Sequence, residues 1–269
     1  MPAPVMHSEV VRVLGEEIVG GALPPGSVVN LAELAERFSR SRTVVREAVR
    51  VLESLGLVVS QRRVGVTVQS STAWSVLSPQ VIAWRLASDA REEQLRNLTQ
   101  LRQAVEPAAA RAAAVLRQGM GGAAAGGEAP VDGPAPAAEP VAGGARSGAQ
   151  RSVVACAVSG LCEAAERLHA LGLRGEGDDE EYIEADVAFH VQLLRASGNE
   201  MFAALEPTIS EVLRGRARLG RNPAWPTRRA LDLHLALARA VEAGRPEEAE
   251  DAARRIAGDV LLEIADPAP

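Results

Sequence analysis

The sequence of 269 residues contains no lysine, so all 29 of its basic residues are arginine. Aromatic residues make up only 3% of the chain, while hydrophobic residues of all kinds make up 47%. A hydrophobic core must therefore be built mainly from alanine, leucine and valine. Because alanine and leucine favour helices, this composition predicts a helix-rich protein.

Long apolar runs are also missing. No run approaches the ~20 residues that a membrane-spanning helix needs, and the first residues lack the basic start and apolar block of a signal peptide. The only cysteines, Cys156 and Cys162, lie six residues apart in one expected helix, a spacing typical of neither a disulfide framework nor a metal knuckle. We therefore expect free thiols, a cytoplasmic location and no membrane partner.

Positive charge is scarce except in one segment. The chain carries 29 basic and 35 acidic residues, but residues 37–63 contain seven arginines and two acidic residues, a local charge of +5. Such a local excess on an acidic body is expected of a nucleic-acid-binding surface. A solvated helix face would give the same count, so charge alone does not decide between the two.

The first 72 residues predict a winged helix-turn-helix domain. Apolar residues recur at helical spacing in three segments, at residues 8–23, 30–38 and 42–58. Residues 57–69 then alternate β-branched and polar side chains, which indicates a short hairpin. Two helices joined by a tight turn, a preceding helix and a two-stranded wing together give this domain type.

Residues 73–269 predict a second domain, an antiparallel bundle of helices, so the fold class is mainly α. A Gly-, Ala- and Pro-rich insert at residues 119–150 has almost nothing to bury and is expected to be flexible. Helical patterning resumes beyond it, so it interrupts one domain. The later helices are expected at residues 151–171, 180–196, 199–219, 227–243 and 246–265, with Pro207 kinking or splitting the third.

The start of the third N-terminal helix carries side chains suited to DNA. Arginines there can contact guanine edges or phosphates, and short hydroxyl residues can bind phosphate oxygens. Ser41, Arg42, Thr43 and Arg46 supply this set, and Arg42 and Arg46 share one helical face. The alternative is an ordinary amphipathic helix with an arginine-rich exposed face.

Residues 8–68 resemble the winged-helix regulators of the GntR type, through Ser41-Arg42-Thr43, through Arg46-Glu47-Ala48 and through the glycine of the wing. The resemblance implies a homodimer that binds an operator, a short inverted repeat in double-stranded DNA. Contacts are implied for Arg42, Thr43, Arg46 and the wing around Arg63 and Gly65. Ala32 stands where some relatives carry a DNA-contacting arginine, a contact that Arg37 or Arg40 could replace.

A second group of residues has the chemistry of metal ligands. Asp186 and His190 are four residues apart on an expected helix, which suits two ligands of one metal. Such a pair is more often a surface interaction or a core histidine. His234 lies in a later helix with an apolar flank, and a buried histidine needs a partner.

The second domain resembles the all-helical effector domain of the FadR branch of the same family. The matching motifs are Leu101-Arg102 with Glu106-Pro107, Asp186 to His190 with Asn199, and Asp232-Leu233-His234 with Gly244. The resemblance implies a divalent metal (Zn, Ni or Mn) on Asp186, His190 and His234, although Ile256 occupies the usual fourth-ligand position. It also implies that Arg102 and Asn199 contact an acidic effector. The alternative for Arg102 is an ion pair with Glu106.

We therefore expect a ligand-responsive regulator of transcription rather than an enzyme: a repressor that a small carboxylate, such as a sugar acid or an organic acid, releases from DNA. A metal-sensing repressor, with the ion itself as the signal, is the first alternative. A small metallohydrolase built on the same three ligands would leave the first 70 residues unexplained, and no nucleophile motif accompanies those ligands.

Overall fold

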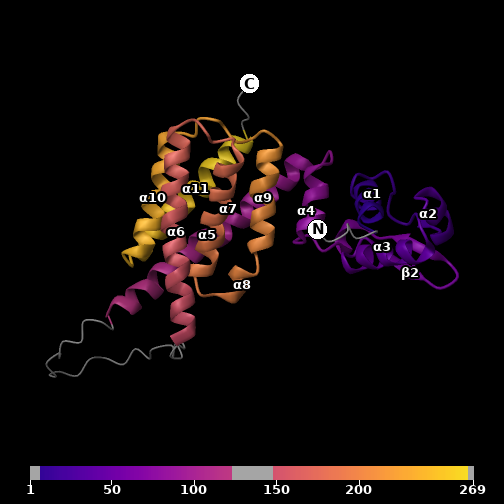
Figure 1. Ribbon diagram of the computed structural model, residues 1–269, viewed down its shortest axis with the longest axis horizontal. Coiled ribbons are helices and arrows are strands. Elements are labelled where there is room, and N and C mark those ends of the chain that lie inside the picture. Colours follow the sequence, from indigo (N-terminus) through magenta and orange to yellow (C-terminus); the bar gives the residue numbers. More distant parts are fainter. Residues whose placement is uncertain (1–6, 123–147, 266–269) are drawn as a thin grey trace. The chain divides into compact units, whose positions relative to one another are not determined.

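The computed structural model describes residues 7–122 and 148–265, which form two compact units that divide between Asn97 and Leu98 (Figure 1). The mainly helical fold with a small sheet in the N-terminal part confirms the predicted fold class. None of the described helices is long and apolar enough to cross a membrane.

The first unit contains three short helices, a small sheet and a further helix. Its helices are α1 (Ser8–Val19), α2 (Leu31–Arg37), α3 (Arg42–Ser54) and α4 (Pro79–Leu86), with a 3-10 turn at Ser71–Ala73. Asn30 caps α2, because its Oδ1 accepts a hydrogen bond from the Ala32 amide at 2.8 Å. Ser41 caps α3 in the same way through the Val44 amide, at 3.3 Å. Polar side chains at both helix starts therefore set the turn between α2 and α3.

The wing has one strand more than the sequence predicts. Strands β2 (Val58–Gln61) and β3 (Gly65–Val68) form the expected antiparallel hairpin, and β1 (Val28–Val29) adds to the other edge of β3 in the order β1-β3-β2. A strand of two residues carries no detectable alternation, so the sequence does not indicate β1. Gly56 ends α3 with a φ of 75°, and a Cβ there would lie 2.1 Å from the Ala73 carbonyl oxygen.

The core of the first unit extends into α4, beyond the predicted domain boundary at residue 72. Trp84 is 5% exposed and packs with α1, and the compact unit ends only at Asn97. The buried residues from the helices and the sheet include Val10, Leu14, Ile18, Leu34, Val45, Val49, Leu52, Val66 and Val68. Apolar positions at helical and strand spacing thus face one small core, as predicted.

Replacing Gly15 with alanine should destabilise the first unit by about 1–3 kcal/mol, because the site is already filled. A Cβ on Gly15 would lie 2.3 Å from Cζ2 of Trp84, whose ring is buried. Gly119→Ala is the control, since a Cβ there has nothing within 4 Å. We expect that change to be neutral or stabilising by up to about 1 kcal/mol. Urea unfolding measures both, and equal midpoints would show that Trp84 does not pack against Gly15.

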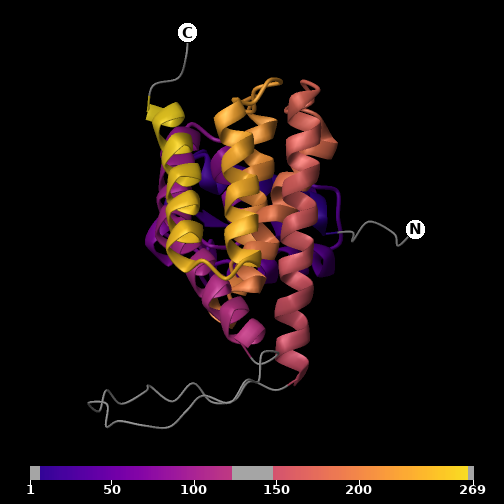
Figure 2. The ribbon, with the colours of Figure 1, turned by 90° about the vertical axis from the view of Figure 1, so that its left-hand side faces the viewer.

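The second unit is a bundle of long helices that run side by side (Figure 2). Its helices are α5 (Arg91–Gly122), which begins in the first unit, α6 (Gly148–Leu173), α7 (Glu180–Ala196), α8 (Glu200–Ala203), α9 (Glu206–Arg218), α10 (Arg228–Glu242) and α11 (Pro246–Ala265). Pro207 splits the predicted helix 199–219 as expected, because it lies in the first turn of α9. Alanines such as Ala113, Ala165 and Ala253 are fully buried between the helices.

Both ends of the predicted insert are helical. Helix α5 continues to Gly122 and α6 begins at Gly148, so both ends of the predicted range 119–150 are helical. The remaining residues of the predicted insert, 123–147, lie outside the described residues.

Candidate functional site

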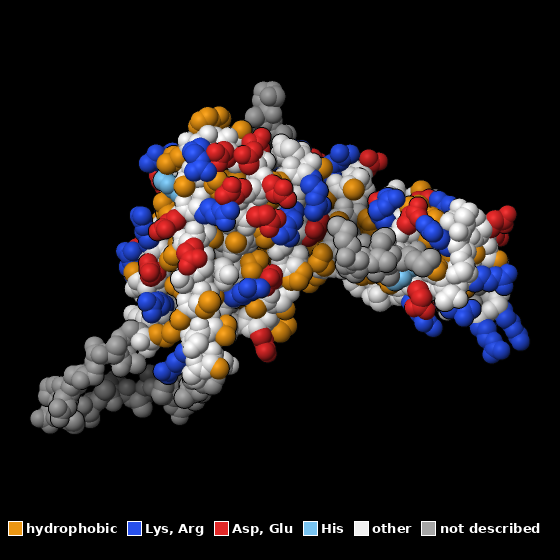
Figure 3. All heavy atoms as spheres, viewed as in Figure 1, with side chains coloured by type: hydrophobic (Ala, Val, Ile, Leu, Met, Phe, Trp, Pro, Cys, Tyr) orange, Lys and Arg blue, Asp and Glu red, His pale blue; other side chains and the backbone are white. Residues whose placement is uncertain are grey.

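The first candidate site is the exposed start of α3 together with the wing. Val45, Ala48 and Val49 face the core of the first unit, whereas Arg42 and Arg46 are exposed on the opposite face. Arginine side chains gather at the end of the first unit where α2 and β2 lie in Figure 1 (Figure 3). The helix therefore presents its basic residues outward on a rigid support.

Ion pairs divide the arginines of this surface into two groups. Arg37 pairs with Glu17, Arg40 with Glu9 at 2.9 Å, and Arg50 with Glu47 at 2.7 Å. A second group has no ion pair or hydrogen-bonded partner for its side chain among the residues described; it comprises Arg42, Arg46, Arg62 and Arg63. Only this second group offers its guanidinium groups without first breaking a contact.

The pairing bears on the two arginines that could compensate for Ala32. Arg40 and Arg37 are both engaged with carboxylates of α1. Exposed pairs of this kind contribute at most about 1 kcal/mol, so DNA could displace them. A contact from Arg40 nevertheless requires it to leave Glu9, which makes Arg40 a weaker candidate than Arg42 or Arg46.

The wing is tied to α3 and turns sharply at its tip. Oε1 of Glu53, near the end of α3, accepts a hydrogen bond from the Ser60 amide of β2 at 2.6 Å. Arg63 and Gly65 have φ values of 68° and 122°. A Cβ on Gly65 would lie 3.0 Å from the Val29 carbonyl oxygen, so this glycine lets β3 approach β1. Gly65 therefore has a structural role in the wing, and Arg63 carries its exposed side chain at the tip.

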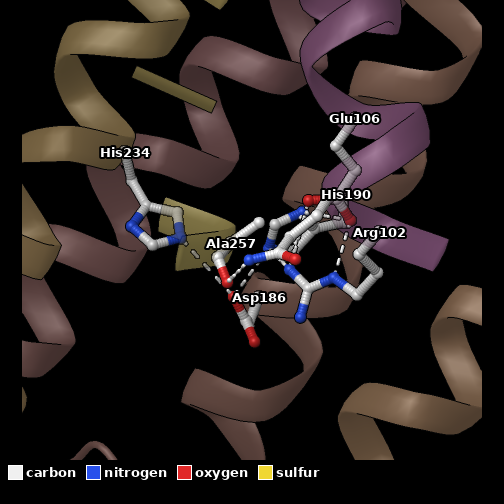
Figure 4. A network of polar contacts seen from close by, with 7 residues as sticks. Arg102, Glu106, Asp186, His190, His234 and Ala257 are labelled. Carbon is white, nitrogen blue, oxygen red and sulfur yellow. Dashed lines mark hydrogen bonds and ion pairs between the residues drawn. The ribbon is translucent and has the colours of Figure 1, made fainter. Parts of the chain in front are cut away.

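The second candidate site is a cavity of about 90 Å³ in the bundle of the second unit. Asp186 and His190 from α7 and His234 from α10 converge on it, and one potential ligand atom from each lies within 4.8 Å of the others. We call these three residues the Asp–His–His cluster. Arg102 from α5 lies beside it, as Figure 4 shows. The structure therefore brings together four of the residues that the sequence singled out from distant segments.

His190 has a partner on each side of its ring. Its Nδ1 lies 3.2 Å from Oε1 of Glu106, and its Nε2 lies 3.5 Å from Oδ1 of Asp186. Nη2 of Arg102 is 2.8 Å from Nε2 and 3.3 Å from Nδ1. A group in line with the Nε2 lone pair would lie much farther from Nδ1, so this guanidinium nitrogen lies over the ring.

His234 is held in a matching way. Its Nδ1 is 2.7 Å from the Ala230 carbonyl oxygen, which can only accept, so Nδ1 carries the hydrogen and Nε2 has the free lone pair. This Nε2 is buried and has no hydrogen-bond partner within the described parts of the chain; it lies 3.8 Å from Oδ1 of Asp186. An orphaned buried nitrogen beside a carboxylate fits a divalent metal bound by Asp186, His190 and His234.

Burial disfavours the charged form of each ionisable side chain in this cavity, and the neighbouring charges decide in which direction its pKa shifts. Burial alone would raise the pKa of Glu106, but Arg102 and His190 lower it to about 2. The pKa of Asp186 is likewise lowered by His190 and His234 against the effect of burial. Burial lowers the pKa of His234, whereas Glu106 and Asp186 outweigh burial and raise that of His190. A metal ion would displace a proton from His190.

Three further residues bear on what this cavity can bind. Ile256 is buried in the cavity wall, so no fourth protein ligand comes from that position. Asp259 also lines the cavity and pairs with Arg229 at 3.2 Å. Asn199 lies elsewhere: it does not line this cavity, and its Oδ1 caps α8 through the Met201 amide at 2.9 Å. An effector bound in this cavity would therefore lie away from Asn199, whose effector contact stays a prediction.

Sequence reasoning also missed part of the site. The sequence named Glu106 in a family motif and as a possible ion-pair partner of Arg102, but not as a neighbour of His190. Both side chains are 2% exposed, and Glu106 also contacts His190. Polar residues of the cavity wall, including Tyr182, Arg216, Asn222 and Thr227, were not predicted. The spacing of Arg102 and Glu106 indicated their pairing, whereas nothing local indicated that the pair faces His190.

Comparison with known proteins gives two family matches. The model for bacterial regulatory proteins of the gntR family matches residues 7–68, and the model for the FCD domain matches residues 148–258. The galactonate operon transcriptional repressor of Escherichia coli (strain K12) is 37% identical over 106 residues, which are 39% of this chain and 46% of that protein. The uncharacterised regulator YieP of the same organism is 31% identical over 105 residues, 39% of this chain and 44% of that protein.

The chain thus spans less than half the length of the curated relatives that it matches. Among solved structures, that of Lar, which controls the expression of the agr system of Listeria monocytogenes, is 14% identical and has a TM-score of 0.54. The match covers 97% of this chain and 97% of Lar. At this identity, the similarity concerns the fold alone.

Proposed function

Since the chain belongs to the GntR family of bacterial regulatory proteins and carries an FCD domain, we propose that it is a cytoplasmic, homodimeric repressor of transcription that a small carboxylate releases from its operator. The observation that carries this proposal is the presence of two separate sites in one chain. One is an exposed basic surface around α3, and the other is a cavity with a buried cation in the helical bundle.

The basic surface suits double-stranded DNA. A helix that projects arginines from its first turns can enter the major groove, where arginine binds guanine through two hydrogen bonds. Arg42 and Arg46 lie on the exposed face of α3, beside Ser41 and Thr43 at the helix start. We assign operator contacts to these four residues, with Arg63 at the wing tip as a further contact.

The cavity suits a small acid. Glu106 holds Nε and Nη2 of Arg102 at 2.7 and 3.3 Å (Figure 4), and Nη1 has no hydrogen bond or ion pair with a described residue. A guanidinium fixed in this way can replace the water around a carboxylate. Because the wall also carries Asn222 and Thr227, the ligand should have hydroxyl groups, as a sugar acid does. The name of the galactonate operon repressor points to the same class.

Asp186, His190 and His234 would hold a divalent metal beside Arg102. When bound, the metal supplies a second positive charge that attracts the carboxylate of the effector. Ile256 provides no ligand, so the effector or water would complete the coordination shell. This arrangement favours a metal that helps to bind the effector over a metal that is itself the signal, since three protein ligands with an open position hold ions less firmly than a closed site.

Binding of the effector and of DNA must be reciprocal. If the effector releases the protein from its operator, operator DNA must weaken effector binding by the same factor. The coupling then belongs to two states of one dimer, which differ in how far apart the two α3 helices are held.

A thermal-shift screen tests the proposal on the full-length protein. Sugar acids and other small carboxylates are added with Zn²⁺, Ni²⁺ or Mn²⁺, and again with a chelator. One class of acid should raise the melting temperature by several degrees, because a ligand at 100 times its Kd stabilises by about 2.7 kcal/mol. The same acid should release the protein from DNA. If chelation alone changes DNA affinity and no acid does, the metal is the signal and our assignment of a carboxylate effector is wrong.

A further inference from the structure

One carboxylate in the second unit has two buried partners of different kinds. Oε1 of Glu106 accepts a hydrogen bond from Nε of Arg102 at 2.7 Å and lies 3.2 Å from Nδ1 of His190. The three side chains are each about 2% exposed. Water therefore does not compete for these contacts, and each partner restricts the carboxylate to one position (Figure 4).

A carboxylate at Nδ1 of a histidine has a defined effect on the other ring nitrogen. It holds the hydrogen on Nδ1, fixes the orientation of the ring and makes Nε2 a stronger ligand. In this protein, Nε2 of His190 is the atom directed toward Asp186, 3.5 Å away. The second histidine of the Asp–His–His cluster uses the Ala230 carbonyl oxygen for the same purpose. Each of the two histidines thus has an acceptor oxygen near its Nδ1, which leaves its Nε2 to bind a metal.

Arg102 does not take the place of a metal at His190. Its Nη2 lies over the imidazole ring, 2.8 Å from Nε2 and 3.3 Å from Nδ1, and so is not in line with the lone pair of Nε2. Its contact with Glu106 through Nε and Nη2 holds the carboxylate in place, with Oε1 3.2 Å from Nδ1. Besides neutralising the charge of Glu106, Arg102 therefore fixes the position of its carboxylate beside His190.

We propose that Glu106 is a positioning residue for metal binding, which holds His190 in the tautomer and orientation of a ligand. This inference rests on the metal site that forms part of the proposed function. The competing account is that Glu106 only neutralises Arg102, in which case removing its contact with His190 would leave metal affinity unchanged.

Co²⁺ is the probe, because its visible absorption reports both the affinity and the number of nitrogen ligands. The full-length protein with Glu106→Gln should bind Co²⁺ about 10- to 100-fold more weakly than the wild type, with weaker absorption bands. The control is Glu184→Gln, which removes a carboxylate of α7 that pairs with Arg214 at the surface. This variant should bind Co²⁺ as the wild type does.

A double-mutant cycle with His190→Ala separates positioning from attraction by charge. If Glu106 acts through His190, adding Glu106→Gln to His190→Ala should cause no further loss of Co²⁺ affinity. A loss of the same size in both backgrounds would overturn the proposal, because the carboxylate would then act on the ion directly.

A second variant, Glu106→Asp, is needed in case Glu106→Gln does not fold. It keeps a negative charge for Arg102 but shortens the side chain by one methylene, so the carboxylate no longer reaches Nδ1. We expect a loss of Co²⁺ affinity comparable to that of Glu106→Gln, and wild-type affinity would overturn the proposal. If the wild type itself binds no Co²⁺, the metal site and the role of Glu106 are both wrong, while the assignments of DNA and carboxylate binding stand or fall by the thermal-shift screen.

Discussion

Replacing Arg46 with alanine should abolish specific operator binding while leaving the protein folded. Each arginine that binds guanine through two hydrogen bonds contributes about 1–3 kcal/mol of discrimination, and a homodimer would lose two such contacts. The affinity should therefore fall by roughly 100-fold or more. The measurement is fluorescence anisotropy at fixed salt, with a duplex that the wild-type protein enriches from a random DNA library.

Arg50→Ala is the matched control for this experiment. Arg50 lies on the same helix and is also exposed, but it is paired with Glu47 and lies farther from the helix start. Its loss should cost at most one phosphate contact, so affinity should change only a few-fold. Circular dichroism should show unchanged folding of both variants, since neither side chain is part of the core. Wild-type affinity of Arg46→Ala would remove the basis for assigning α3 to the major groove.

Replacing Arg102 with methionine should destabilise the second unit by about 3–5 kcal/mol, because it leaves the buried carboxylate of Glu106 without its cation. The melting temperature of this unit should fall by roughly 10 °C. Arg214→Met is the control, since Arg214 forms a similar pair with Glu184 at 2.8 Å that is largely exposed. Such a pair contributes at most about 1 kcal/mol. Calorimetry resolves the unfolding of separate units and would measure the melting temperature of both variants. Equal decreases in melting temperature would show that Glu106 is accessible to water.

The same interaction predicts how stability depends on pH. The folded protein lowers the pKa of Glu106 from 4.5 to about 2, so its ionised form stabilises the fold by about 3 kcal/mol at pH values above 4.5. This contribution should be lost as the pH falls from about 4.5 to about 2. In Arg102→Met, only His190 is left to lower the pKa of Glu106 against the effect of burial, so the loss of stability on acidification through this window should be much smaller. Urea unfolding at several pH values would measure it, and parallel curves for the two proteins would contradict this origin.

The basic surface shows what the sequence could and could not predict about a site. Arg42 and Arg46 share one face of α3 because the helical repeat fixes their directions, and that repeat is visible in the sequence. The pairing of Arg40 with Glu9 joins residues 31 positions apart. It depends on how α1 packs beside α2 and α3, which no local pattern encodes.

The Asp–His–His cluster also shows which features the sequence predicts and which it does not. The four-residue spacing of Asp186 and His190 and the family motifs were enough to name the Asp–His–His cluster. The contact of Glu106 with His190 and the position of Arg102 over its ring arise only where α5 meets α7. Asn199, which the same motif included, lies at a helix start because its own backbone turns there.

By itself the sequence determined the two kinds of domain, the helices of both and the residues with the chemistry to bind DNA and metal. These properties follow from the spacing of residues along one element, because hydrogen bonds within a helix or hairpin fix which side chains share a face. Only the tertiary structure decided which arginines stay unpaired, that Trp84 and α4 complete the first unit, and that Arg102 and Glu106 are buried against His190. Those outcomes depend on which faces of different helices pack together, and burial in turn sets the charges and the pKa of Glu106.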